Sequence, residues 1–270
     1  MEAKASVILR FRNGSENRAQ NLRTLIRHIS RNPHVEIIVS AMDKDINLRE
    51  FRALKKSAPG RAKLIHVFTP KPFASTTANN VGVAKASTDI FIFQDADILF
   101  DNSAYNKIIK QIGAGRESVR VGEECLNLNN PNTKKVHHAY AKGKWGHPPI
   151  NEFLKLKERL GKKGSRDAPG ACTAVSRKAF LDIGGWCELF QVYGWEDCYF
   201  RYKVRQLDHV SLKMPMVHLA HEVNYQSGHQ KDNNGLYSQL ISANKAKYKD
   251  LIRRDREALF SKYPSLRKQV

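Results

Sequence analysis

Apolar and polar residues alternate along the first hundred positions in blocks of two kinds. Short runs rich in β-branched and aromatic residues are typical of buried strands, and longer stretches with apolar residues three and four apart are typical of helices. The predicted strands are 5–11, 35–41, 62–69 and 89–97, and the predicted helices are 17–30, 47–57 and 75–87. This order predicts an α/β fold, with a Rossmann-like, mostly parallel sheet flanked by helices on both faces.

The pattern changes after residue 127. Residues 127–169 are rich in Asn, Lys, His, Gly and Pro, and we interpret them as a long excursion with one amphipathic helix at 151–160. Ser176 then has the character of a helix N-cap, and Gly184 or Gly185 that of a helix end. The last predicted elements are a helix from Glu196, a strand at 209–219 and a basic helical stretch at 238–262.

Length and composition limit the class of protein. A chain of 270 residues, 41% of them hydrophobic, can bury a sizeable core. The N-terminus lacks the apolar run of a signal peptide, and no segment reaches the roughly 20 apolar residues of a membrane-spanning helix. The cysteines show no CxxC spacing, so we expect buried thiols in a reducing cytoplasm, not a zinc site or disulfides. They are Cys125, Cys172, Cys187 and Cys198.

The net charge of +20 is concentrated in two segments. Residues 130–170 contain ten Lys and Arg against three Asp and Glu, and residues 245–270 contain nine against three. Such clustering indicates a polyanionic partner, either nucleic acid or an anionic membrane surface. The alternative is a basic protein whose charge serves only solubility.

Asp95 and Asp97 form a DAD motif directly after an apolar predicted strand. Ligands of such sheets bind beyond the carboxyl ends of the strands. Carboxylate oxygens there suit Mg²⁺ or Mn²⁺, which in turn would hold a diphosphate. The alternative is a helix N-cap, because Asp101 and Asn102 precede a helical pattern.

His218 and His221 form an HxxH pair whose rings could share one face of a turn. Imidazole beside carboxylate favours Mn²⁺ over Mg²⁺. A pair of core or surface histidines is the alternative.

The stretch GWEDCYF places two carboxylates, Glu196 and Asp197, at a predicted helix start. The helix macrodipole stabilises negative charge there, and an ionised carboxylate can act as the general base for a hydroxyl nucleophile. Trp195 and Tyr193 offer flat faces for a sugar ring or a base. The alternative is an acidic helix start beside a core tryptophan.

The order of these motifs resembles the GT-A glycosyltransferases, in particular the β-1,4-galactosyltransferases and the related family 2 sugar transferases. The likeness covers about residues 5–225. It rests on FRN at Phe11-Arg12-Asn13, on DAD, on GGW followed by GWED, and on HLAH.

The resemblance implies a nucleoside-diphosphate sugar, UDP-linked, as the donor. Phe11 and Arg12 match positions that contact the uridine nucleotide, and Asp95 matches a residue that faces the ribose or the donor sugar. By the same resemblance, the metal ligands are Asp97, His218 and His221, with Mn²⁺ or Mg²⁺ as the cofactor.

The resemblance also implies an acceptor side. Asp197 matches the catalytic base, and Glu196 matches an acceptor-binding carboxylate beside Trp195. Gly170 and Ala171 match the small-residue turn next to the acceptor. The expected reaction is a single displacement with inversion at the anomeric carbon.

The domain organisation follows from this comparison. We expect one GT-A domain at 1–235, with a nucleotide-sugar-binding half at 1–100 and an acceptor and metal half at 101–235. Residues 236–270 are expected to form a basic helical tail.

Two acceptors stay open. The basic excursion contains Tyr140 and Trp145 and leads into Gly170, which suits a nucleic-acid backbone. A hydroxymethylated DNA base flipped into the pocket, as in phage-type DNA glycosylation in the host cytoplasm, is the interpretation we favour. The rival is a capsule or lipopolysaccharide-type glycan transferase whose basic tail lies on anionic lipid at the inner membrane. A non-catalytic nucleic-acid or glycan-binding module is a third interpretation, against which the complete set of base and metal ligands argues.

Overall fold

The structure is a computed structural model, and it describes most of the chain. The described residues are 2–12, 15–43, 62–68, 74–122, 124–142, 171–190, 194–222, 228–242 and 245–267. The helices predicted at 47–57 and 151–160 lie outside these residues, as do Tyr193 and Trp145.

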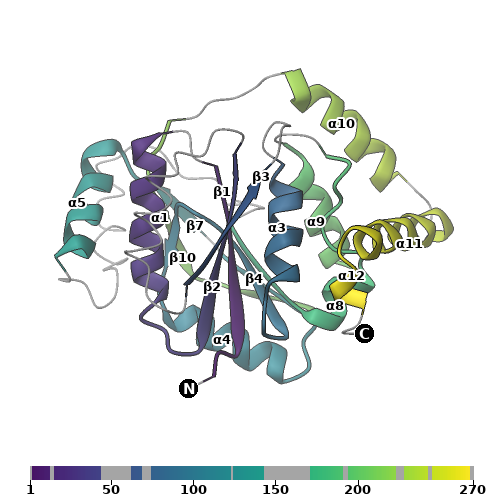
Figure 1. Cartoon of the computed structure of the whole chain (residues 1–270), viewed down its shortest axis with the longest axis horizontal. Coiled ribbons are helices and arrows are strands. Elements are labelled where there is room, and N and C mark those ends of the chain that lie inside the picture. Colours follow the sequence, from purple (N-terminus) through teal and green to yellow (C-terminus); the bar gives the residue numbers. More distant parts are fainter. Residues whose placement is uncertain are drawn as a thin grey trace.

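A seven-stranded sheet forms the centre of the described part of the chain (Figure 1). Its strands are β1 (Ala5–Phe11), β2 (Val35–Asp43), β3 (Ala62–Phe68), β4 (Ile90–Asp95), β6 (Ser118–Val121), β8 (Cys172–Ser176) and β9 (His209–Leu212). They are ordered β3-β2-β1-β4-β8-β6-β9. The first four are parallel, β8 is antiparallel to both of its neighbours, and β6 pairs with β9 in parallel. The predicted α/β class with a mostly parallel sheet is confirmed.

Helices cover both faces of this sheet (Figure 1). One face carries α1 (Glu16–Ile29), α4 (Ser103–Gly113) and α5 (Asn130–Ala141), and the other carries α3 (Ser75–Ala84), α8 (Arg177–Asp182) and α9 (Glu196–Val204). Alternation along β1 divides the core between the two faces. Leu9 packs with the first set of helices and Ile8 with the second.

Helix α3 approaches the sheet closely because its packed face is made of small residues. A Cβ added at Gly82 would lie 2.5 Å from Cγ2 of Ile8. The contact places the N-terminus of α3, with Ser75, beside the strand ends.

A second, three-stranded sheet contains β5 (Ile98–Phe100), β7 (Glu124–Asn127) and β10 (Pro215–His218), in the order β5-β10-β7. The single strand predicted at 209–219 is therefore wrong, because β9 and β10 belong to different sheets. Strand β9 ends at Leu212, and β10 begins at Pro215. Pro215 lacks the backbone N–H that a continued β9 would need for hydrogen bonding to the next strand. Strand β10 pairs His218 with Ile98, two residues beyond Ala96 of the DAD motif.

We predicted that residues 127–169 form an excursion with a single helix at 151–160. This prediction is wrong for residues 130–141, which form helix α5. Asn129 caps the helix by accepting a hydrogen bond from the Asn132 backbone N–H, and Pro131 lies in the first turn. Val136 and Tyr140 are buried against the core.

The C-terminal region contains α10 (Gly228–Ile241), α11 (Lys245–Lys262) and α12 (Pro264–Arg267), so the helical prediction for 238–262 is confirmed for 238–241 and 245–262. Leu259, Phe260 and Leu266 pack into the same hydrophobic cluster as Phe93 of β4. Gly184, at φ 71°, leaves room for α11, since a Cβ there would lie 2.8 Å from the Arg256 backbone nitrogen. Helices α11 and α12 therefore share a core with residues 1–235, and the division at residue 235 stays a prediction.

Candidate functional site

The ends of β1 and β4 and the start of α9 bring three charged side chains together. Arg10 of β1 and Asp95 of β4 are paired in register on adjacent parallel strands. Asp197 lies in the first turn of α9. Arg10 donates from Nη1 to Asp197 Oδ1 at 2.8 Å, and from Nη2 to Asp197 Oδ2 at 3.0 Å and Asp95 Oδ1 at 2.8 Å.

Arg10 is the cation of this cluster, and the sequence analysis missed it. Burial alone would lower its pKa, but the charges of Asp197 and Asp95 outweigh burial and hold the pKa well above its ordinary value. The signal in the sequence was a single charged residue near the end of an otherwise apolar strand.

The side chain of Asp95 is partly buried, with 30% of its surface exposed. Burial raises the pKa of Asp95 to about 6. Arg10 opposes the shift, while the charges of Asp197 and Asp97 add to it.

Glu196 is fully buried, with 3% of its surface exposed. Burial, followed by the charge of Asp197, raises the pKa of Glu196 to about 7. Its Oε1 accepts a hydrogen bond from Ser75 Oγ at 2.9 Å. The two adjacent acids thus lie in different surroundings. Asp197 accepts hydrogen bonds from the Arg10 guanidinium, and Glu196 accepts one from the Ser75 hydroxyl.

Trp195 precedes these acids in a left-handed conformation, with φ 68°. This conformation is unfavourable for a residue with a side chain. The residue is 37% exposed, and its ring stacks on Tyr237 of α10, with the ring centroids 5.0 Å apart. One partner for the Trp195 ring therefore comes from the chain itself.

Asp97, His218 and His221 form a group whose ligand atoms all lie within 4.8 Å of one another. The Nε2 atoms of His221 and His218 lie 3.0 Å and 3.7 Å from the Asp97 carboxylate. Nδ1 of His221 lies 2.9 Å from the Glu222 backbone carbonyl, which can only accept. Nδ1 therefore carries a proton, and Nε2 is the ring nitrogen that faces Asp97. One carboxylate and two imidazoles fit a divalent transition metal.

The same contacts shift the pKa values of Asp97 and His218 when no metal ion is bound. Burial favours neutral Asp97, but hydrogen bonds from His218 and His221 hold its pKa well below the usual range. Burial would lower the pKa of His218, and the hydrogen bond and charge of Asp97 raise it above the ordinary value.

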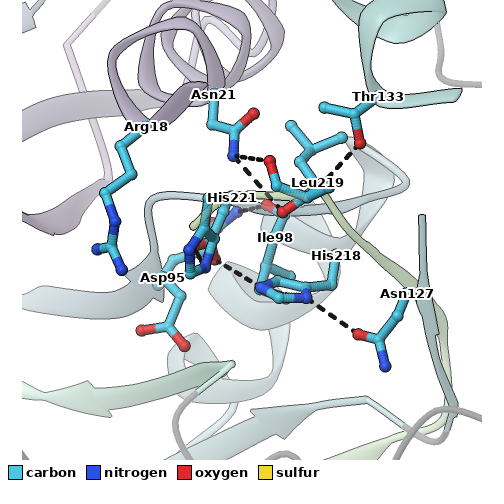
Figure 2. Close-up of polar contacts among 12 residues, drawn as sticks. Arg18, Asn21, Asp95, Ile98, Asn127, Thr133, His218, Leu219 and His221 are labelled. Atoms are coloured by element: carbon cyan, nitrogen blue, oxygen red, sulfur yellow. Dashed lines mark hydrogen bonds and ion pairs between the residues drawn. The ribbon is translucent and has the colours of Figure 1, made fainter. Parts of the chain in front are cut away.

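Two buried polar side chains hold the segment that carries these histidines (Figure 2). Asn21 of α1 donates to the carbonyl oxygens of Leu219 and Ala220, at 3.5 and 3.2 Å. Thr133 of α5 accepts from the Ala220 N–H at 2.9 Å. Sequence reasoning missed both residues, because their role depends on the packing of α1 and α5.

The other predicted site residues lie at the same edge or outside the described chain. Phe11 is 5% exposed and packs in the core, and Arg12 follows it, partly buried, at the strand end. The Ala171 carbonyl accepts the Asp95 N–H at 3.2 Å, which places this residue beside the DAD motif. Gly170 lies outside the described residues.

Comparison with known proteins identifies a family. Residues 6–184, about two thirds of the chain, match the model described as Glycosyl transferase family 2. No curated protein sequence matches.

Two solved structures are similar at low identity. The catalytic domain of Drosophila β1,4-galactosyltransferase 7, complexed with xylobiose, has 14% identity and a TM-score of 0.46, over 78% of this chain and 64% of that one. Glucosyl-3-phosphoglycerate synthase from Mycobacterium tuberculosis, complexed with phosphoglyceric acid, has 18% identity and a TM-score of 0.48, over 88% and 77%. This chain thus spans less than two thirds of the galactosyltransferase domain.

The contrast between the buried Glu196 and the partly buried Glu188 tests the electrostatics of the site. Because the pKa of Glu196 rises from an ordinary 4.5 to about 7, its contribution to stability is present below pH 4.5 and lost as the pH rises through 7. Glu196→Gln does not titrate, so it should gain stability over the wild type between pH 5 and 8, on the order of 2 kcal/mol.

Glu188 is the matched control with the opposite sign. Burial would raise its pKa, but hydrogen bonds from Lys262, Asn80 and Thr77 lower it. Its contribution is present above its ordinary pKa and lost in acid, so Glu188→Gln should be less stable than the wild type at neutral pH. Urea unfolding at several pH values measures both variants. If the free energy of unfolding of Glu196→Gln depends on pH in the same way as that of the wild type, the shifted pKa of Glu196 is contradicted.

Proposed function

We propose a metal-dependent, inverting reaction at a hydroxyl acceptor for this chain, which belongs to glycosyl transferase family 2 and transfers sugar from a nucleotide sugar. The observation that carries the proposal is the meeting of two groups at one sheet edge. Asp97, His218 and His221 form a set of possible metal ligands. Beside it lie Asp95 and Asp197, which both accept hydrogen bonds from Arg10.

On the donor side, we assign Asp97, His218 and His221 as the residues that would hold the cation, with Mn²⁺ preferred because two ligands are imidazoles. A bound cation supplies Lewis-acid stabilisation of a diphosphate leaving group. Asp95 would face the ribose or the sugar of a UDP-linked donor. Phe11 and Arg12 would contact the nucleotide, Phe11 through its backbone since its side chain is in the core.

On the acceptor side, Asp197 would accept the proton of the attacking hydroxyl. As that oxygen bonds to the anomeric carbon, the bond from this carbon to the diphosphate oxygen breaks, and the configuration inverts. Glu196 would hydrogen-bond a second polar group of the acceptor, and Trp195 would stack on the ring of the acceptor. Gly170 and Ala171 would line the edge of the acceptor site.

A polyanionic acceptor is supported by the basic surface of two neighbouring helices, α1 and α5 (Figure 1). Among the residues of these helices, Glu16 is the single acid. The exposed cations on and just beyond them are Arg27, Arg31, Lys134, Lys135 and Lys142. We favour a hydroxymethylated base in DNA, flipped out of the stack toward Trp195.

The rival acceptor is a membrane-associated glycan, with α11 lying on anionic lipid. The geometry of α11 favours this less. Arg253 pairs with Asp250 and Glu257, and Arg254 lies 3.7 Å from Asp250. Leu259 and Phe260 pack against the domain and not toward solvent. An amphipathic helix needs its apolar face for lipid, so α11 as folded is poorly suited to that role.

No helix within the described ranges has both the length and the apolar character to cross a bilayer. The cytoplasmic location stays a prediction from the sequence. A non-catalytic binding module would have no use for a carboxylate base beside a set of metal ligands.

The metal assignment predicts that Asp97→Ala and His221→Ala each abolish metal-stimulated release of nucleoside diphosphate. His209→Ala is the matched control, because His209 lies on β9 and contacts Ser118 away from the site, and it should keep full turnover. Calorimetry should show Mn²⁺ binding to the wild type and the control but not to the two site variants. Full turnover of the wild type in excess chelator would refute the assignment.

The assignment of the base predicts that Asp197→Asn lowers transfer by roughly 10²-fold or more, since it keeps the shape and removes the basicity. Donor affinity should change little, because the donor is held by other residues. Steady-state transfer and donor titration measure the two effects. If Glu196→Gln loses transfer and Asp197→Asn does not, the two roles are exchanged.

The acceptor assignment predicts salt-dependent binding to duplex DNA. Each neutralised phosphate contributes about −0.9 to the slope of log affinity against log salt. Lys134→Glu combined with Lys135→Glu should weaken DNA binding and make this slope shallower by about 2 if both contact phosphates. Metal-dependent hydrolysis of the donor should persist.

The matched charge change on the tail is Arg253→Glu with Arg254→Glu. It should leave DNA binding nearly intact, and under the rival assignment it would release the protein from anionic vesicles. Labelled sugar should appear on hydroxymethylated DNA and not on plain DNA. Label on free glycosides alone would end the DNA assignment.

A further inference from the structure

We propose that Arg10 is a positioning residue that fixes the Asp197 carboxylate for proton transfer and links it to Asp95. The inference rests on the proposed function, because it takes Asp197 as the base and Asp95 as a donor-side acid. Nothing in the matched motifs singles out Arg10, which precedes the FRN stretch.

Arg10 forms a bidentate pair with Asp197 and a further hydrogen bond to Asp95. The two Nη atoms of Arg10 each donate to a different oxygen of Asp197, and Nη2 also donates to Asp95. A planar guanidinium that contacts both oxygens of a carboxylate fixes the plane of that group, which a lysine ammonium does not do. The orientation of Asp197 therefore depends on the guanidinium fork.

This arrangement leaves Asp197 able to accept a proton. An ionised carboxylate has about four lone-pair sites, and the fork uses one on each oxygen. The remaining site on each oxygen lies in the plane that Arg10 sets. Arg10 thus holds the base without using up its acceptor capacity.

The rest of the structure holds Arg10 in place. Its guanidinium carbon lies 5.9 Å from the centroid of the Trp186 ring, and Trp186 stacks on Phe200 of α9 at 3.9 Å. The side chain is 13% exposed. Strand β1, strand β4 and helix α9 meet at this one group, so a change at Asp95 reaches Asp197 through a shared nitrogen.

A double-mutant cycle tests the inference. Arg10→Lys keeps the charge and removes the fork, so it should lower kcat for transfer by about 10- to 100-fold, the cost of a misplaced catalytic group. The donor KM should change less than kcat. In an Asp197→Asn background, Arg10→Lys should cause no further loss of kcat, because the group that it positions has already lost its function.

Arg177→Lys is the matched control. Arg177 is also poorly exposed, binds a carboxylate, Asp89, at 2.7 Å and lies over the Phe91 ring, but at the opposite end of β4. It should keep the wild-type kcat. Thermal melting monitors the fold of every variant.

Arg10→Gln is the second variant, for the case in which Arg10→Lys does not fold. Combined with Asp197→Asn it removes a positive and a negative charge together, so the buried charge stays balanced. The double variant should match Asp197→Asn in kcat.

Three outcomes would decide against the inference. These are a wild-type kcat for Arg10→Lys, equal losses of kcat in both backgrounds, and equal losses for Arg10→Lys and Arg177→Lys. Failure of the proposed function is distinguishable, because the wild type itself would then release no nucleoside diphosphate from any nucleotide sugar.

Discussion

The site depends on a balance of buried charge at one edge of the sheet. Asp95, Asp97 and Asp197 are partly buried there and Glu196 is fully buried, so burial disfavours the charged form of these carboxylates. Arg10 and the histidine pair supply the opposite charge or the hydrogen bonds. The cost of burying unpaired charge explains why these partners come from strands and helices far apart in the sequence.

This balance gives similar acids different properties. Hydrogen bonds from two imidazoles outweigh burial and depress the pKa of Asp97. Burial and the charge of Asp197 raise the pKa of Glu196, which accepts a hydrogen bond from the Ser75 hydroxyl. Burial also raises the pKa of Asp95, and the charge of Asp197 adds to the shift while Arg10 opposes it. A transferase that binds a cation next to a diphosphate needs the first kind of acid, and one that handles a neutral hydroxyl can use the second.

The sequence predicted the elements whose residues carry a local signal. Strand β1 and helix α1 follow from the spacing of residues such as Leu9 and Leu25, and the start of α9 from Glu196. Features set by distant contacts could not be predicted. Helix α5 has few apolar residues and is fixed by the burial of Val136, and the division of β9 from β10 depends on a second sheet.

The site shows the same limit. The motifs placed Asp97 and His221 together, and the structure agrees, because each motif lies directly at the end of a strand. Arg10, Asn21 and Thr133 act through partners between 85 and 199 residues away, and none belongs to a motif. Their functions become visible only when the sheet order is known.

The acidic site and the basic surface have to be considered together. A phosphate backbone is repelled by uncompensated carboxylates, so a polyanionic acceptor requires the acids to be neutralised locally and cations to lie nearby. Screening limits the useful range to about 8 Å at physiological salt. On α5, Lys134 faces solvent next to Thr133, which contacts the histidine segment. On α1, Asn21 contacts the same segment, and the exposed Arg27 lies about 9 Å further along the helix. Arg253 and Arg254 of α11 pair with acids of their own helix instead. The position of the positive charge, more than its total, therefore favours an acceptor that reaches the site along α1 and α5.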